Sequence, residues 1–489
     1  MTTLSSALSY ALSGLSVSAA QSALVSRNVS FAGDENYTRK YAEVYTLPGG
    51  APATTSANRN MDNRLLAKLL GSTSSASGRQ AIVDALNRLS ATVGDPEADG
   101  SLAAMLGNLQ STLKTYETNP SSSALAGAAL ESARGVVLKL NETSAEVISI
   151  RSEADQAMSQ SVEHINTLLS QFKVVNDSII RGSGTAGDLA ESLDQRDSIL
   201  KLLSEEIGIR TVSRPNNDLV IYAEGGTVLF EGSPRSVSMV PTSVFSPVTG
   251  GQAVYVDGVP VTGEASPMLV TNGKLAALAQ VRDDISLTMQ RQVDEIAAGL
   301  IRSFSESDQS AIPTLPDVAG LFITTAGGLP VAGTWTPGLA SRIRLNSLAD
   351  PLQGGTPFLI RDGGFGGGAY IHNQTGSAGY QTRIGQLISS FDAAQSFDPA
   401  SALGINASLK NFGKDSAAWV EGQRQIAQAA ADSASVVKVR ANETLLRVTG
   451  VNIDQEMAAL LDLEKSYQAS SKVISVIDSM LATLLEAVG

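Results

Sequence analysis

The sequence predicts a mainly α protein, with terminal coiled-coil helices and a long antiparallel helical bundle built from both ends of the chain, with inserted small β-rich domains. Three observations carry this prediction. Apolar residues at both ends alternate spacings of four and three, residues 122–181 form one uninterrupted helical pattern, and the apolar period changes to two at Ile209. A helical protein with β insertions is therefore expected.

The two terminal segments carry narrow apolar stripes of coiled-coil type, and Asn452 and Asp454 supply N-cap chemistry before the second one. Neither stripe can bury itself alone, because a lone amphipathic helix is marginal in water. The alternative is that both helices simply pack on the globular body. We expect residues 1–35 and 455–489 to form a terminal coiled-coil assembly domain with these interface residues: Leu8, Leu12, Leu15, Ala19, Met457, Leu460, Leu463, Tyr467, Ile474, Ile477, Leu481 and Leu484.

A bundle is predicted from residues 36–208, 273–310 and 411–454. A stripe from Leu102 to Tyr116 ends at Asn119-Pro120, because the residue before proline avoids the helical conformation. The long pattern over 122–181 then ends at a Gly-Ser-Gly cluster, and a further stripe runs from Leu189 to Leu203. Long helices joined by short breaks favour an antiparallel rod.

Two insertions are expected. In residues 209–272, alternating runs flank Gly225-Gly226 and Asp257-Gly258, which are hairpin signals. Residues 311–410 are rich in Pro, Gly and Thr, and short apolar runs such as Phe358-Leu359-Ile360 suggest a second mixed β-rich insertion with a helix near 379–393. Helix returns over 274–306 and 414–448, so the chain re-enters the bundle after each insertion.

Composition excludes several classes of function. The net charge is −13, which argues against binding to nucleic acid phosphates or to anionic lipid. The absence of cysteine excludes disulfides and thiol chemistry, and two histidines cannot build a poly-histidine metal centre. Residues 1–26 lack the Lys or Arg of a secretory signal peptide, and no run of about 18 apolar residues indicates a membrane span. We expect no nucleic acid and no membrane as partners.

No local motif in the sequence indicates an enzyme. Asp95, Glu97 and Asp99 imitate half a calcium loop, but Leu106 stands where its bidentate acid belongs. Glycines 364 and 366 with Ala369 match a dinucleotide spacing, but residues 369–372 suggest a strand where a helix is needed. The S-x-x-K matches at 111–114 and 198–201 lack their partner motifs. Neither His164 nor His372 has an evident carboxylate partner and nucleophile. We predict no catalytic, cofactor-binding or metal-binding residues.

Three segments carry a family resemblance. The run Gly450-Val451-Asn452-Ile453-Asp454-Gln455-Glu456-Met457 resembles the C-terminal signature of flagellar axial proteins, in the form of their hook-associated members. Residues 4–15 and Ser26-Arg27-Asn28-Val29 match that family's start, and Leu193-Asp194-Gln195-Arg196-Asp197 looks like its bundle helix. The sequence departs from the family's T-P-G-Y turn, where Asn36-Tyr37-Thr38-Arg39 stands.

The resemblance implies a structural layer between hook and filament, outside the cell, reached by type III export of an unfolded chain without a cleaved signal. It implies as partners further copies of the chain, the hook protein, the second junction protein and an export chaperone. Flagellin or the second junction protein, and a secreted adhesin using 311–410, remain alternatives. From the stripes we expect the terminal helices to be loose in the free subunit and to pair on incorporation.

Overall fold

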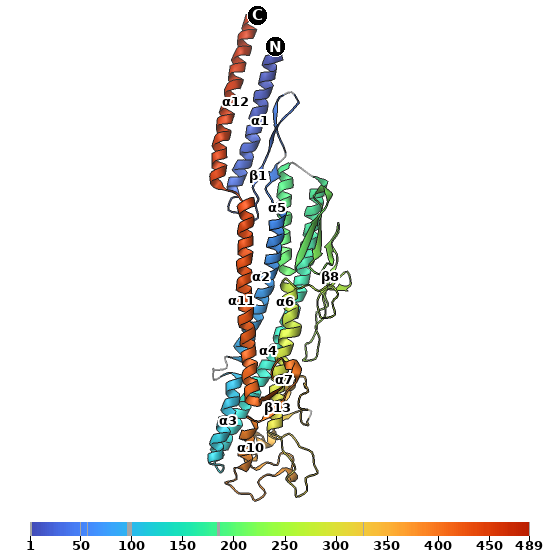
Figure 1. The fold of residues 1–489 in the computed structure, drawn as a ribbon, viewed down its shortest axis with the longest axis vertical. Helices are drawn as coiled ribbons and strands as arrows, with labels where there is room; N and C mark the ends of the chain where they lie inside the picture. Colours follow the sequence, from blue (N-terminus) through green and yellow to red (C-terminus); the bar gives the residue numbers. More distant parts are fainter. Residues whose placement is uncertain are drawn as a thin grey trace.

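The chain folds into an elongated rod, in a computed structural model that describes residues 2–48, 50–55, 57–94, 100–182, 186–325 and 327–488 (Figure 1). Long helices at both ends of the chain and small sheets inserted between them confirm the predicted fold class. Helices α1 (Thr2–Ser30) and α12 (Ile453–Val488) extend together beyond one extremity of the bundle. Residues 311–410 lie at the opposite extremity.

Long helices build the rod between these extremities. Helix α11 (Leu409–Thr449) packs along α2 (Asn63–Val93), although residues 94–408 separate them in sequence. Helix α4 (Ser123–Arg181) packs against α3 (Leu102–Thr118), α5 (Ala186–Glu206) and α7 (Ser286–Ser303). Helix α6 (Lys274–Gln280) continues into α7 through a π-helical turn, Val281–Ile285.

The helix boundaries follow local chemistry. Helix α3 ends before Asn119-Pro120, as predicted, and α4 runs unbroken to Gly182, whose φ of 61° gives the left-handed cap that glycine adopts at low cost. Helix α2 was not predicted as a separate element. Its start is marked by Asp62, whose side chain accepts hydrogen bonds from the amides of Arg64 and Leu65.

Two hydrophobic cores share α4. The core farther from the termini joins α2, α3, α4, α7 and α11, and Leu106, Leu113 and Tyr116 are wholly buried in it. The second core joins the C-terminal half of α4 to α5 and to the β strands, where Phe172 packs edge-on against Phe230 with ring centroids 4.8 Å apart. Helix α4 therefore connects the two hydrophobic cores into one continuous rod.

Residues 209–272 form two small antiparallel sheets on the flank of α4. One has the order β5 (Ile209–Ser213), β6 (Leu219–Ala223) and β7 (Val228–Phe230), and the other has the order β10 (Val259–Pro260), β9 (Tyr255–Val256) and β8 (Val237–Ser238). Both predicted hairpins are confirmed, because β6 pairs with β7 and β9 with β10.

Residues 311–410 are mostly turns and short helices. The described part of this range contains two strand pairs, β11 (Phe322–Thr324) with β12 (Ile343–Leu345) and β13 (Ala394–Ser396) with β14 (Asn406–Ser408). The helix expected near 379–393 is α10 (Thr382–Ser390), and the remaining helices of four residues are α8 (Leu339–Arg342) and α9 (Leu359–Asp362). Buried Asp294 of α7 anchors this region by accepting hydrogen bonds from the backbone of Gly338 and Ala340, both at 2.8 Å.

Two local strand predictions in this region were wrong. The apolar run at 358–360 enters α9, and residues 368–370 form a 3-10 turn where a strand was expected. Glycines 363, 364 and 367 have φ between 73° and 102°, so the backbone turns repeatedly and cannot extend. The half calcium loop at Asp95, Glu97 and Asp99 lies outside the described residues.

Candidate assembly site at the paired terminal helices

Helices α1 and α12 pack along each other (Figure 1). In the contact between them, called the seam here, α12 supplies the bulky side chains. Ile477 is buried, and four more of the predicted residues are half-buried: Leu460 and Leu463, three residues apart, and Ile474 and Leu481, which lie three residues before and four residues after Ile477. Spacings of three and four place such residues on one face of a helix, which here faces α1.

Helix α1 supplies the small side of the seam. Its stripe at spacings of four, three and four is Ala7, Ala11, Gly14 and Ser18, and the Ser18 hydroxyl donates to Ser466 Oγ at 3.2 Å. A Cβ at Gly14 would lie 3.4 Å from Ser470 Oγ, so the two backbones approach closely there. The predicted α1 stripe lies beside this seam: Leu8 and Leu15 are half-buried, and Leu12 and Ala19 are exposed.

Bulky apolar side chains point outward from the pair. Among the predicted residues Leu12, Met457, Tyr467 and Leu484 are 44–51% exposed. They are joined on α12 by further exposed side chains: Ile453, Leu461, Val473, Val476, Met480 and Leu485. Exposed apolar surface of this extent is typical of a face that a partner covers.

Helix α1 is long and apolar enough over Leu4–Ser30 to cross a membrane by length and composition alone, which the sequence analysis did not expect. A core helix of a soluble protein passes the same test. Here the helix pairs with α12 through small side chains, and serines line its outer groove beside Leu8 and Leu12.

A buried polar joint fixes the base of the pair to the bundle. Asn28 is fully buried and uses all four of its hydrogen-bonding positions: it donates to Glu456 and to the Lys40 carbonyl at 2.9 Å, and it accepts from the Tyr37 hydroxyl and the Lys40 amide at 2.9 and 3.0 Å. Glu456 also accepts from Arg39 Nε at 2.5 Å. Satisfied buried networks of this kind specify one geometry.

Helix α5 provides the carboxylates that pair with the basic residues next to this joint. Asp194 contacts Lys40 Nζ at 2.6 Å and Arg59 at 3.2 Å, and Arg59 also reaches Asp197 at 2.5 Å. Burial raises the pKa of Tyr37 to about 12, lowers the pKa of Lys40 and raises the pKa of Asp197. The residues of the three segments that carry the family resemblance, Asn28, Asp194 and Glu456, therefore meet at one point.

The corner between α11 and α12 requires glycine. The Gly450 amide donates to the Leu446 carbonyl at 2.7 Å, and a Cβ at this position would lie 2.5 Å from the same oxygen. Asn452 Oδ1 then accepts from the amides of Asp454 and Gln455 at 3.0 and 3.2 Å, which confirms Asn452 as the predicted cap, whereas Asp454 lies in the first turn of α12. The chain turns here and starts a new helix.

A short hairpin, β2 (Val44–Thr46) and β3 (Pro52–Thr54), lies along α1 and was not predicted. The exposed side chains of Val44, Tyr45 and Leu47 are accessible by 42–51%. The alternation Val44-Tyr45-Thr46 and the Pro-Gly-Gly turn at 48–50 were the available signal. The hairpin extends the apolar surface of the terminal pair.

One correction concerns His164, for which no carboxylate partner was expected. Its Nδ1 lies 2.9 Å from Glu206, which also accepts from the Ser161 hydroxyl at 2.5 Å. The hydroxyl bonds the carboxylate and not the imidazole, so this is not the geometry of a nucleophile activated by a base. Burial lowers the pKa of the second histidine, His372, to about 4.

Two stretches of the chain are similar to families of flagellar proteins. Residues 86–316 match the family described as flagellar hook-associated protein FlgK helical domain, and residues 445–487 match the family described as flagellar basal body rod FlgEFG protein C-terminal. These matches confirm the resemblance found in the sequence.

Curated relatives agree with these families. Flagellar hook-associated protein 1 of Salmonella typhimurium is 24% identical over 314 residues, which is 62% of this chain and 56% of the relative, and that of Escherichia coli K12 is 23% identical over 57% of its length. The chain thus spans little more than half the length of these relatives. The flagellar hook junction protein FlgK from Burkholderia pseudomallei aligns with 53% of this chain and 46% of its own, at a TM-score of 0.43 and 21% identity.

Proposed function

We propose that this chain, a relative of flagellar hook-associated protein 1 that carries its helical domain, is a structural component of the bacterial flagellum in the layer between hook and filament. The match over residues 86–316 carries this proposal and favours it over flagellin or an adhesin. The paired terminal helices suit the role because they present apolar side chains away from the body of the same chain.

Copies of the chain assemble through this surface. Each Leu or Ile side chain that becomes fully buried contributes roughly 1.5–3 kcal/mol, opposed by the loss of side-chain and backbone freedom. Contacts between different faces of identical subunits build a helical array and not a closed pair. The polar joint at Asn28 and Glu456 sets the angle at which each terminal pair leaves its bundle. Hook protein and the second junction protein cover the two sides of the layer.

The free subunit differs from the assembled one at its ends. Residues 2–30 and 453–488 are helices in the structure. Between them, small side chains of α1 face bulky side chains of α12 that are mostly only half-buried. We therefore expect the pair to fray before neighbours cover it, and an export chaperone to hold it until then. A cysteine-free chain is suited to export through the type III channel as an unfolded thread without a cleaved signal.

Electron microscopy of isolated flagella tests the proposal. An epitope on this protein labelled with gold should mark one site between hook and filament, and cells lacking the protein should lose their filaments. Label spread along the filament would indicate flagellin, and label away from the flagellum would overturn the proposal.

A further inference from the structure

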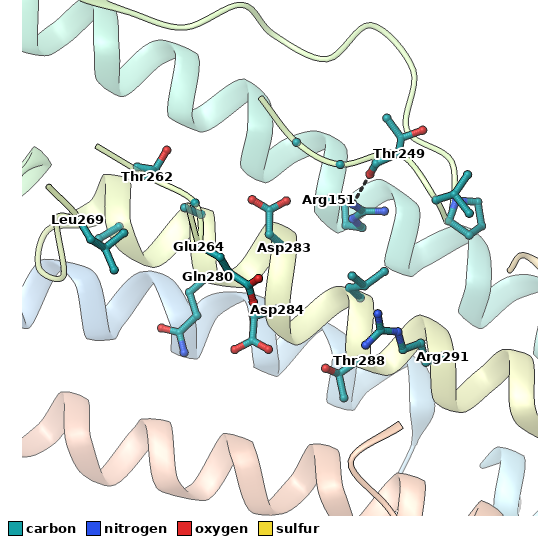
Figure 2. A pocket seen from close by; sticks show the side chains of 18 of the residues that line it. Arg151, Thr249, Thr262, Glu264, Leu269, Gln280, Asp283, Asp284, Thr288 and Arg291 are labelled. Atoms are coloured by element: carbon teal, nitrogen blue, oxygen red, sulfur yellow. Dashed lines mark hydrogen bonds between the residues drawn. The ribbon is translucent and has the colours of Figure 1, made fainter. Parts of the chain in front are cut away.

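A cleft of about 920 Å³ separates the β-rich segment from the α6–α7 helix (Figure 2). It is lined by the loops 247–251 and 262–271 and by the π-helical turn with its neighbours, and Leu269 and Leu287 supply apolar surface. A volume of this size accommodates several side chains of a protein partner.

Two carboxylates in this cleft are unpaired. Asp283 forms an ion pair with Arg282 at 2.7 Å, whereas the exposed side chains of Glu264 and Asp284 make no hydrogen bond or ion pair within the described residues. The nearby cation Arg151 is occupied by the carbonyls of Arg282, Ser246 and Thr249. The three acidic side chains gather in one part of the cleft, and Arg291 lies farther along the helix (Figure 2).

The rim of the cleft is apolar and fixed in place. Val248 lines the cleft and is 68% exposed, and the segment 239–254 that contains it has no charged residue and also exposes Val240 and Val244 outside the cleft. Buried Asp155 accepts from the Thr242 amide at 2.7 Å, and Arg151 holds two carbonyls of the same loop. An uncharged segment that is held in place beside free carboxylates fits a partner surface that is both apolar and basic.

The same chain has such a surface on its other flank. Helix α11 lies on the opposite edge of the rod from the β-rich segment (Figure 1). Its outer face exposes Val436, Val437 and Val448 by 41–49%. Arg440 and Arg447 lie on this face, are exposed, and have no ion-pair partner among the described residues.

We propose that this face of α11 in one copy docks on the cleft of the next copy, with Arg440 and Arg447 opposite Glu264 and Asp284. The proposal rests on the proposed function, because it names the lateral contact within the layer. The C-terminal part of α11 lies close to the terminal helices, whereas α6 and the start of α7, whose residues line the cleft, lie farther along the rod (Figure 1). Each docked copy is therefore displaced along the rod axis relative to its neighbour, and repeated displacement gives an open helical array.

Cysteine cross-linking in isolated hook–filament particles tests the contact, and the cysteine-free chain provides a clean background. Glu264→Cys combined with Arg440→Cys should give a ladder of dimers and higher multimers on oxidation. The two sites lie on opposite flanks, so a bond within one copy cannot form. Glu264→Cys combined with Lys114→Cys, an exposed position on α3, should give no ladder. Loss of the ladder in particles that carry the labelled protein at the junction overturns the contact and leaves the proposed function intact.

Charge reversal gives a second readout. Arg440→Glu should reduce the number of attached filaments tenfold or more while secretion and the melting midpoint of the purified protein stay unchanged. Glu264→Arg in the same chain should restore at least half of the filaments. Undiminished attachment with Arg440→Glu, or no rescue, contradicts the charge pairing. Absence of the wild-type protein from the junction instead refutes the proposed function.

Discussion

Glu295 on α7 makes the stability of the bundle depend on pH. Its side chain is fully buried, and burial raises its pKa from 4.5 to about 7, against the opposing effect of Arg302. The folded chain therefore keeps this proton at pH values where the unfolded chain has lost it. Folding stability should fall as pH rises from about 4.5 to 7, and the cost is complete above pH 7.

The size of the effect follows from the shift. One pKa unit corresponds to about 1.4 kcal/mol, so a shift from 4.5 to about 7 corresponds to a cost on the order of 3 kcal/mol at pH 8. Glu295→Gln removes the ionisation and should stabilise the protein at pH 8 by up to this amount. At pH 4.5 the variant and the wild type should be nearly equal in stability.

Urea unfolding at pH 5, 6, 7 and 8 measures this difference directly. Glu421→Gln is the matched control of opposite sign, because hydrogen bonds from Arg424 lower the pKa of Glu421 to about 2. Its removal should not stabilise the protein at any of these pH values. A free-energy difference between wild type and Glu295→Gln that stays constant from pH 5 to 8 would refute the reasoning.

Three further predictions concern the terminal pair. Asn28→Asp places a second carboxylate 2.9 Å from buried Glu456 and should cost about 3–5 kcal/mol, seen as faster hydrogen exchange at the joint and fewer attached filaments. Ile477→Asp should abolish the helix pair and filament attachment, whereas Leu485→Asp, at a 75% exposed position, should impair attachment and leave the circular dichroism of the subunit unchanged. Limited proteolysis of the purified subunit should remove residues 1–30 and 455–489 before it cuts the bundle, and equal resistance would contradict the expected fraying.

The sequence revealed the helices because their signals are local. The stripes of α3 and α4, the cap at Asn452 and the turn at Gly225-Gly226 all act within a few residues. Helix α2 was missed as a separate element because serines and threonines break its stripe, and several of them are buried against other segments. Such burial depends on partners that are distant in sequence.

The candidate site was only partly predictable for the same reason. Helix α12 turns part of the predicted stripe inward and leaves Met457, Tyr467 and Leu484 exposed. Helix α1 turns its alanines, glycine and serine inward and leaves Leu12 exposed. An apolar stripe favours leucine over Gly14, yet close backbone approach favours the small residue. The polar joint was visible only as family resemblance, since nothing local in Asn28, Asp194 or Glu456 indicates that they meet.

The pairing of α2 with α11 has a consequence for how the chain reaches its native state. These helices enclose everything from residue 94 to 408, so their contact closes a very long loop. The enclosed helices and hairpins have nearer partners and can form first, because contacts at short sequence separation cost less chain entropy. The enclosed elements are therefore expected to fold first, and the packing of α11 along α2 follows them.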